Sequence, residues 1–413
     1  MHTLYMQGKN KVMFRSIAAD LAHVIKRKQS ALLMGPRQVG KTTLIENLLP
    51  PQSMTIALQD PSERRAYEQD PSLLIRRVRA EKSASMIFID EAQKVPELMD
   101  AVQLLIDRNE ASFLITGSSA RKLKRHGTNL LPGRVKSFRL DPLSWSELGW
   151  KKESRIRELA QPNSPHPSSY TFEDAMVFGS LPGIIKQDDV GDRRDFLTAY
   201  AHIYLEEEIR AESLTRKIGA FARFLELAAA ESGTAPNLSK LAMESGVSAP
   251  AIRGFYALLE ETLVMERVDP FLRGARKRIL SSSRYFLFDL GVRNCLARLP
   301  LTPELLRTQK GTLFEQAVTL ELIRRLRSLH RDYRVCFWRT SGGAEVDLVI
   351  DTGTTVIPIE IKAGTTVCLG ELKGLRHFLE DYKAIAPRGY VITQGTHPEQ
   401  LSKQILALPW SAL

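Results

Sequence analysis

Residues 35–42 read Gly35-Pro36-Arg37-Gln38-Val39-Gly40-Lys41-Thr42, and Thr43 follows. The apolar run 31–34 before them is typical of a buried strand, and the segment 42–49 is typical of a helix. The glycines permit a tight turn that points backbone N–H groups and the positive helix end at one centre. This pattern predicts a phosphate-binding loop formed by 35–43, with Lys41 reaching the β and γ oxygens of a nucleotide and Thr42 meeting Mg²⁺. A glycine-rich structural turn is the alternative, and it explains Lys41 and Thr42 poorly.

A second apolar run, residues 85–89, is typical of a central strand in a parallel sheet. Asp90 and Glu91 follow at its carboxyl end, where open α/β sheets bind ligands. We expect Asp90 to hold Mg²⁺ through water and Glu91 to polarise the water that attacks the γ-phosphate. In the alternative interpretation, Asp90 only caps the next helix.

A third strand is predicted over residues 113–115, and hydroxyl side chains follow it at Thr116 and Ser118. Either hydroxyl is placed to sense the γ-phosphate from the neighbouring strand. The sequence does not choose between the two, and a plain turn is the other interpretation.

Three stretches together resemble the AAA+ ATPases: residues 35–42, 87–96 and 114–119. Residues 131–135 and 141–147 are more narrowly similar to a prokaryotic branch whose ATPase core is joined to a C-terminal domain of uncharacterised role. The resemblance implies ATP and Mg²⁺ as cofactors.

The same resemblance places an arginine finger at Arg134, just before a strand predicted over 135–140. An arginine of this kind acts on the γ-phosphate bound to a neighbouring subunit, so a homo-oligomer, in the form of a ring or filament, is implied. Alternatively, Arg134 only pairs with a local carboxylate.

The composition of the chain indicates its cellular compartment and the class of its partners. The chain has 413 residues, and its 58 Lys and Arg against 47 Asp and Glu give a net charge of +11. That balance favours DNA or another polyanion as a partner. The 3 cysteines are too few for a disulfide framework or a metal cluster. No apolar run approaches the roughly 20 residues needed to span a bilayer, and the N-terminus lacks a signal-peptide core. We therefore expect a cytoplasmic protein without membrane contact.

The middle of the chain is predicted to be mainly helical. Helices over 172–178 and 194–212, separated by the turn 179–183, are expected to form the ATPase lid, and Glu206–Glu208 to form a solvated helix face. Helices over 218–230, after Asn237 and over 248–259, with a strand over 263–268, follow the winged-helix order. Candidate phosphate contacts are Arg253, Arg273, Arg276, Lys277, Arg278 and Arg284. Alternatively, this unit serves only to dock proteins.

The C-terminal part carries a second set of candidate residues. A helix is predicted over 311–326 and 372–379, and strands over 335–340, 345–350, 356–362 and 390–392. Period-two alternation places Glu345 and Asp347 on one face of their strand, and Glu360 and Lys362 on one face of theirs.

This layout resembles the restriction-endonuclease-like fold, with an Asp followed at a distance by Glu-x-Lys. The resemblance implies that Asp347 and Glu360 hold Mg²⁺, that Lys362 orients or activates water, and that Glu315 is the helix acid. Alternatively, the fold survives as a structural or DNA-docking platform, with these carboxylates and Lys362 as a buried ion cluster.

The fold class is therefore expected to be α/β, in four units. They are an AAA+ P-loop core over 1–150, a linker and helical lid over 151–214, a winged-helix-like domain over 215–275 and a restriction-endonuclease-like domain over 276–413. The first function hypothesis is an ATPase that remodels, translocates or cleaves DNA. The second is a nucleotide-dependent switch that binds a protein partner through a non-catalytic C-terminal platform.

Overall fold

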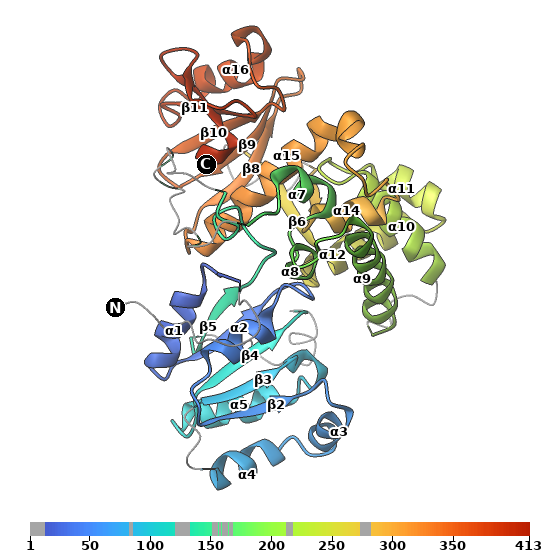
Figure 1. Ribbon diagram of the computed structural model, residues 1–413, viewed down its shortest axis with the longest axis vertical. Helices are drawn as coiled ribbons and strands as arrows, with labels where there is room; N and C mark the ends of the chain where they lie inside the picture. The colour runs from blue at the N-terminus through green and yellow to red at the C-terminus, as the bar shows by residue number, and fades with distance from the viewer. Residues whose placement is uncertain are drawn as a thin grey trace.

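The computed structural model contains two β-sheets joined by a helical middle region (Figure 1). It describes residues 13–81, 86–119, 133–150, 156, 158, 164, 168–211, 218–272 and 282–413. Several predicted features lie outside these residues: the pair 131–132, most of the linker at the start of the unit 151–214, and Arg273, Arg276, Lys277 and Arg278. The side chains of Glu206–Glu208 lie outside them as well.

The N-terminal sheet has five strands in the order β2-β3-β4-β1-β5, and all its pairings are parallel. Its strands are β1 (Ser30–Met34), β2 (Ser53–Ala57), β3 (Met86–Asp90), β4 (Phe113–Gly117) and β5 (Val135–Arg139). Its helices are α1 (Ala18–Lys26), α2 (Lys41–Leu48), α3 (Pro61–Gln69), α4 (Leu73–Ala80), the 3-10 turn η1 (Ala92–Lys94) and α5 (Leu98–Asp107). The predicted α/β fold class is confirmed.

The parallel register brings the predicted site segments to one edge of this sheet. Met34 pairs with Gly117, and Ala57 pairs with Asp90, so all four strands end together. The loop after β1, the two carboxylates after β3 and the hydroxyls after β4 therefore meet at the carboxyl edge, as expected of an open parallel sheet.

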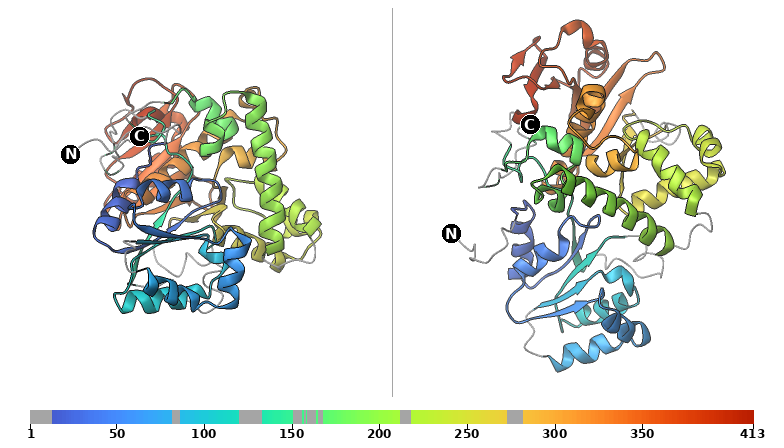
Figure 2. Two further views of the ribbon diagram at one scale, coloured as in Figure 1. Left: turned by 60° about the horizontal axis from the view of Figure 1, so that its bottom comes forward. Right: turned by 45° about the vertical axis from the view of Figure 1, so that its right-hand side comes forward.

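The middle region is built from helices that lie beside the junction of the two sheet-containing units (Figure 2). They are α7 (Phe172–Phe178), α8 (Pro182–Ile185), α9 (Val190–Ala211), α10 (Ile218–Ala230), α11 (Leu238–Ser245) and α12 (Ala249–Glu261). Local sequence sets their ends: Thr171 and Asp174 form a capping box on α7, and Asn237 and Ser248 cap α11 and α12. No described helix has the length and apolar character required to cross a membrane.

The second sheet is mixed and has the order β12-β13-β11-β10-β9-β8-β6-β7. Its strands are β6 (Met265–Pro270), β7 (Arg284–Leu287), β8 (Arg334–Arg339), β9 (Glu345–Asp351), β10 (Val356–Ile361), β11 (Gly389–Thr393), β12 (Glu399–Gln400) and β13 (Ile405–Pro409). Its helical elements are α14 (Leu290–Leu296), α15 (Leu305–Ser328), η3 (Leu369–Glu371), α16 (Lys373–Asp381) and η4 (Trp410–Ala412).

Two features of this sheet were not predicted. The hairpin β6–β7 joins it because Asp269 and Pro270 pair in parallel with Cys336 and Phe337, so the expected boundary at residue 275 falls between two strands of one sheet. The helix expected from residue 311, which packs on this sheet, begins six residues earlier, at Leu305, after Pro303 and Glu304.

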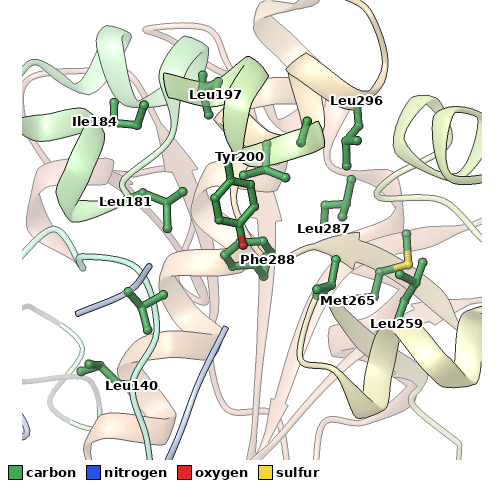
Figure 3. Close-up of a cluster of buried hydrophobic side chains, with 14 of the residues drawn as sticks. Leu140, Leu181, Ile184, Leu197, Tyr200, Leu259, Met265, Leu287, Phe288 and Leu296 are labelled. Atoms are coloured by element: carbon green, nitrogen blue, oxygen red, sulfur yellow. The ribbon is translucent and has the colours of Figure 1, made fainter. Parts of the chain in front are cut away.

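Apolar cores join the units. One cluster contains Leu140 after β5, Leu181 and Tyr200 of the α8–α9 region, and Leu259 and Met265 further along the chain (Figure 3). In the C-terminal unit, Leu348 and Ile350 pack in a cluster with α15, whereas Val349 packs in a separate cluster with α16. The two helices therefore cover opposite faces of the second sheet.

Candidate functional site

The loop between β1 and α2 is a compact phosphate-binding turn. Gly40 adopts φ 92° immediately before Lys41 opens the helix, a conformation that favours glycine. Gly35 has no room for a side chain, because a Cβ there would lie 2.3 Å from the carbonyl oxygen of Leu140. The ammonium of Lys41, which is 5% exposed, donates to the Gly35 and Pro36 carbonyls at 2.9 Å each. The loop thus points a buried cation and a helix N-terminus at one centre.

Asp90 is held at the edge of the sheet by three side-chain donors. The Thr42 hydroxyl lies 3.1 Å from both carboxylate oxygens, and the Thr116 hydroxyl donates to Oδ1 at 2.5 Å. The Gln59 amide donates to Oδ2 at 3.1 Å. Thr42 and Asp90, the two predicted Mg²⁺ residues of this site, are therefore in direct contact. Their oxygens form the hard donor set that Mg²⁺ prefers, so the site fits the ion.

Glu91 adopts a left-handed backbone, with φ 57° and ψ 47°, which is unusual for a residue other than glycine. Its backbone N–H donates to the Thr116 hydroxyl at 3.0 Å, and its carboxylate lies 4.0 Å from the ammonium of Lys41. The Gln93 amide donates to this carboxylate and also to the Ser118 hydroxyl, at 2.9 Å. Strained conformations of this kind concentrate at functional sites. Here the strain directs the carboxylate towards the loop.

A cavity of about 490 Å³ opens over the loop. It is lined by Arg37, Gln38, Gly40, Lys41, Thr42, Thr43, Gln59, Glu91, Lys94, Pro182 and Tyr200. Six predicted nucleotide-binding residues are among them, together with Glu91. Gly35, Pro36 and Val39 are not, and the Val39 side chain is fully buried in the apolar core.

Three cavity residues were not predicted from the sequence: Gln59, Lys94 and Tyr200. Gln59 could have been predicted, because it follows the strand next to β3 at the edge where the parallel strands end. Nothing in the sequence predicted Tyr200, which reaches the cavity because α9 packs against the N-terminal unit.

Thr116 and Ser118 occupy different positions in the site. Thr116 contacts Asp90 and the backbone of Glu91, whereas Ser118 contacts Gln93 and lies 3.4 Å from the Glu91 carboxylate. Both are buried. Thr116 thus lies beside Asp90, a predicted Mg²⁺ residue, and Ser118 lies beside the Glu91 carboxylate.

Arg134 lies far from this edge. It precedes β5, whose first residue pairs with Ser30 at the start of β1, so it is at the amino edge of the sheet. Its guanidinium forms an ion pair with Asp107 at 2.5 Å. Arg134 therefore has the local carboxylate partner of the alternative interpretation, on the edge opposite its own phosphate-binding loop.

The candidate residues of the C-terminal unit converge from four elements. Lys362, just after β10, donates to Glu360 at 2.8 Å, and Asp347 of β9 accepts the Ile361 N–H at 2.7 Å. Arg284 of β7 lies 3.6 Å from Glu315 of α15 and forms a close ion pair with Glu345. We call the carboxylates Glu315, Glu345, Asp347 and Glu360 the acidic cluster.

Burial and mutual repulsion perturb these groups. Burial, reinforced by Asp347, raises the pKa of both Glu315 and Glu360 to about 7. Burial also raises the pKa of Asp347, against the Ile361 N–H and Lys362. Burial lowers the pKa of Lys362, but the bond to Glu360 and the surrounding carboxylate charges together outweigh burial and raise that pKa. Burial, followed by repulsion between the carboxylates, therefore favours the protonated forms of these carboxyl groups.

The donor atoms are those that a hard divalent cation takes. Glu360 Oε2 is buried without a hydrogen-bond partner among the described residues, and it belongs to one of the two predicted metal ligands. Within the described ranges, no three or more His, Cys, Asp or Glu side chains are spaced to enclose a metal. Mg²⁺ commonly binds through one or two carboxylates and keeps several waters. Asp347 and Glu360 fit that mode.

Comparison with known families divides the chain into three segments. Residues 27–149 match a family described as an AAA domain. Residues 169–303 and 310–413 match two domains of unknown function, DUF8612 and DUF4143. Together with the loop geometry, the first match supports an ATPase of the AAA+ P-loop type in the N-terminal unit.

Individual proteins are similar over longer stretches. The uncharacterized proteins Rv2008c of Mycobacterium tuberculosis and Mb2031c of Mycobacterium bovis are each 25% identical over 405 residues, covering 96% of this chain and 83% of theirs. The Walker-type ATPase PABY2304 of Pyrococcus abyssi is 15% identical, with a TM-score of 0.46, over 68% of this chain and 94% of that one.

Proposed function

We propose that this chain is a Mg²⁺-dependent ATPase whose nucleotide cycle gates a metal-dependent, nucleic-acid-directed site in its C-terminal unit. The contact of Thr42 with Asp90, beside Lys41 and Glu91 on one cavity, carries the proposal. Thr42 and Asp90 would hold Mg²⁺, which would supply positive charge against the phosphates. Lys41 would bind the β and γ oxygens, and Glu91 would accept a proton from the attacking water.

Helix α15 supports the idea of gating, because it carries Glu315 of the acidic cluster and also contacts the turn 179–183. Near its C-terminal end, Arg324 donates to the Ser180 hydroxyl at 2.9 Å, two residues before the cavity residue Pro182. Glu315 of the acidic cluster lies nine residues earlier, roughly 13 Å along the helix. A shift of the turn over the nucleotide can therefore reach the cluster through one rigid element.

A second link joins the same helix to the end of β5. Arg327 pairs with Asp141 at 2.6 Å and with Glu266 of β6 at 2.9 Å. Burial acts to raise the pKa of Asp141, but Arg327 and Arg139 outweigh it and hold that pKa at about 2. The pair therefore stays charged over the working pH range and fixes α15 to the ATPase unit.

DNA is the proposed nucleic acid. The net charge of +11 favours a polyanion, and α10, α11, α12 and the hairpin β6–β7 follow the order of a winged helix. We propose that this unit contacts the DNA backbone and that Asp347, Glu360 and Lys362 act on a phosphodiester. Bound Mg²⁺ would there polarise the phosphate and lower the pKa of water, while Lys362 orients that water.

The alternative function is a nucleotide-dependent switch that binds a protein partner. One observation favours it: Arg284 and Lys362 already pair with cluster carboxylates, as in a non-catalytic platform. ATP turnover, measured with single-stranded, duplex and branched DNA in parallel with Mg²⁺- or Mn²⁺-dependent nicking, separates the two functions. We expect DNA-stimulated turnover, and nicking that disappears in Asp347→Ala and Lys362→Ala. Slow turnover indifferent to DNA, with no nicking, would favour the switch.

We further propose that Arg134 acts in a neighbouring subunit of a homo-oligomer. Asp107 provides a matched control, because Arg134→Ala and Asp107→Ala break the same ion pair. A finger in trans predicts that only Arg134→Ala loses ATP turnover and that the wild type enlarges with ATP in size analysis. Equal turnover in both variants would assign Arg134 to the local pair.

A further inference from the structure

Arg284 enters the acidic cluster from a different part of the chain. It is the first residue of β7, in the hairpin β6–β7, whereas the cluster carboxylates belong to α15, β9 and β10. From the sequence, Arg284 is predicted to contact phosphate outside the cluster. The structure instead buries it to 8% exposure among the carboxylates.

Three contacts hold the Arg284 guanidinium. It forms a close ion pair with Glu345, lies 3.6 Å from Glu315, and stacks over the Phe337 ring at 4.5 Å. Asp347 and Glu360 also act on it electrostatically. A guanidinium in this position interacts electrostatically with all four carboxylates, as a bound metal ion would.

The neighbouring cations differ from Arg284 in position. Lys362 pairs with Glu360 and is 34% exposed, and Arg339 lies 3.7 Å from Glu345 with 62% of its side chain exposed. Arg284, at 9%, is the most buried of these three. Interior charges interact far more strongly than exposed ones, so Arg284 contributes most to balancing the cluster.

We propose that Arg284 is a built-in counter-cation that competes with a divalent metal ion for the acidic cluster. This inference rests on the metal site of the proposed function. A metal ion held by Asp347 and Glu360 would repel the Arg284 guanidinium and loosen its contacts with Glu315 and Glu345. The hairpin β6–β7 that carries Arg284 therefore sets the metal affinity of the C-terminal unit. Burial lowers the pKa of Arg284, and the carboxylates offset this only in part, so the guanidinium is held there at a net cost.

The test is Mn²⁺ binding to the full chain, measured by calorimetry and by the electron paramagnetic resonance of free Mn²⁺. Nucleotide is left out, and all proteins carry Asp90→Asn, which removes the metal-binding carboxylate of the nucleotide site. Arg284→Gln should bind Mn²⁺ about tenfold or more tightly than the parent, since one interior positive charge is removed. Arg284→Lys, which keeps the charge, should remain within about threefold of the parent.

Arg339→Gln is the matched control, because it removes another arginine contact of Glu345 from an exposed position. It should change the affinity little, as exposed pairs are weak. An affinity in Arg284→Gln equal to that of the parent would overturn the inference while leaving the metal site intact. Binding that is undiminished by Asp347→Ala, or absent from every variant, would instead overturn the proposed metal site and the inference with it.

A second measurement covers the case in which Arg284→Gln fails to fold. In the parent protein labelled with ¹⁵N-arginine, the side-chain resonance missing from Arg284→Lys identifies Arg284. Saturating Mg²⁺ should shift this resonance and release its hindered rotation. An unchanged resonance with Mg²⁺ bound would show that Arg284 only anchors the hairpin β6–β7 structurally, and the inference would fail.

Discussion

The nucleotide site and the acidic cluster hold carboxylates in opposite ways. Asp90 accepts bonds from Thr42, Thr116 and Gln59, whereas Glu360 has one oxygen that is buried without a partner among the described residues. The first site is preorganised by hydrogen bonds from neighbouring strand ends. The second gathers four carboxylates around Arg284 and Lys362, which reach them from other elements of the fold. A chain can thus build one site from local turns and another from long-range packing.

The largest expected effect is the loss of nucleotide binding in Lys41→Ala. The ammonium is buried within the loop, and removing it leaves the phosphate charge without its main cation. We expect an affinity loss of about a hundredfold or more, measured with a fluorescent ATP analogue. Asp347→Ala should bind the analogue like the wild type, and a comparable loss there would show that the two sites are not separable.

Glu91→Gln should separate binding from hydrolysis within the first site. The amide is isosteric but cannot accept the proton of the attacking water, so turnover should fall about 10²–10⁴-fold. The Kd for ATP should remain within a few-fold of the wild type. Phosphate release in single-turnover conditions measures the step. Hydrolysis at the wild-type rate would remove Glu91 from its assigned role.

Asp289→Ala should weaken the junction between the two sites. This carboxylate is fully buried, accepts the Ser180 N–H at 2.7 Å and caps α14 through Val292. Leaving buried donors without a partner costs about 1–3 kcal/mol of unfolding free energy, measured by urea denaturation. Asp60→Ala removes an exposed helix cap of α3 and is the control, with a smaller expected loss. Equal losses of unfolding free energy in the two variants would show that the contacts of Asp289 do not stabilise the junction more than an exposed helix cap does.

The smallest expected effect is a pH dependence of the metal-free protein. The pKa of Glu360 is raised to about 7, so the folded state binds more protons than the unfolded state between about pH 4.5 and 7. Stability should therefore fall as pH rises through this window. We expect a drop in Tm of about 2–4 °C between pH 5 and 8 in EDTA, reduced in Glu360→Gln. An identical drop in that variant would place the titrating group elsewhere.

The sequence predicts the nucleotide site well because its geometry is local. Residues 35–43 form one turn, and strand ends in a parallel sheet must share an edge, so Asp90, Glu91, Thr116 and Ser118 come together. Gln59 follows the same rule and was overlooked. Tyr200 depends on how α9 packs, which no local pattern encodes.

The C-terminal unit was harder to predict because its contacts are long-range. Glu360 and Lys362 were paired correctly from strand alternation. Arg284 was placed on DNA because nothing in its own segment shows that β6 pairs with β8 and brings β7 to the cluster. The strands β12 (Glu399–Gln400) and β13 (Ile405–Pro409) were missed, and β12 has only two residues, both exposed.

The most direct test of the account is ATP turnover by the purified wild-type chain, measured as phosphate release with Mg²⁺ and with EDTA. We predict saturable hydrolysis that requires Mg²⁺ and is lost in Glu91→Gln. A protein that neither binds nor hydrolyses any nucleoside triphosphate with Mg²⁺ present would contradict the central claim that residues 35–43 bind ATP for hydrolysis.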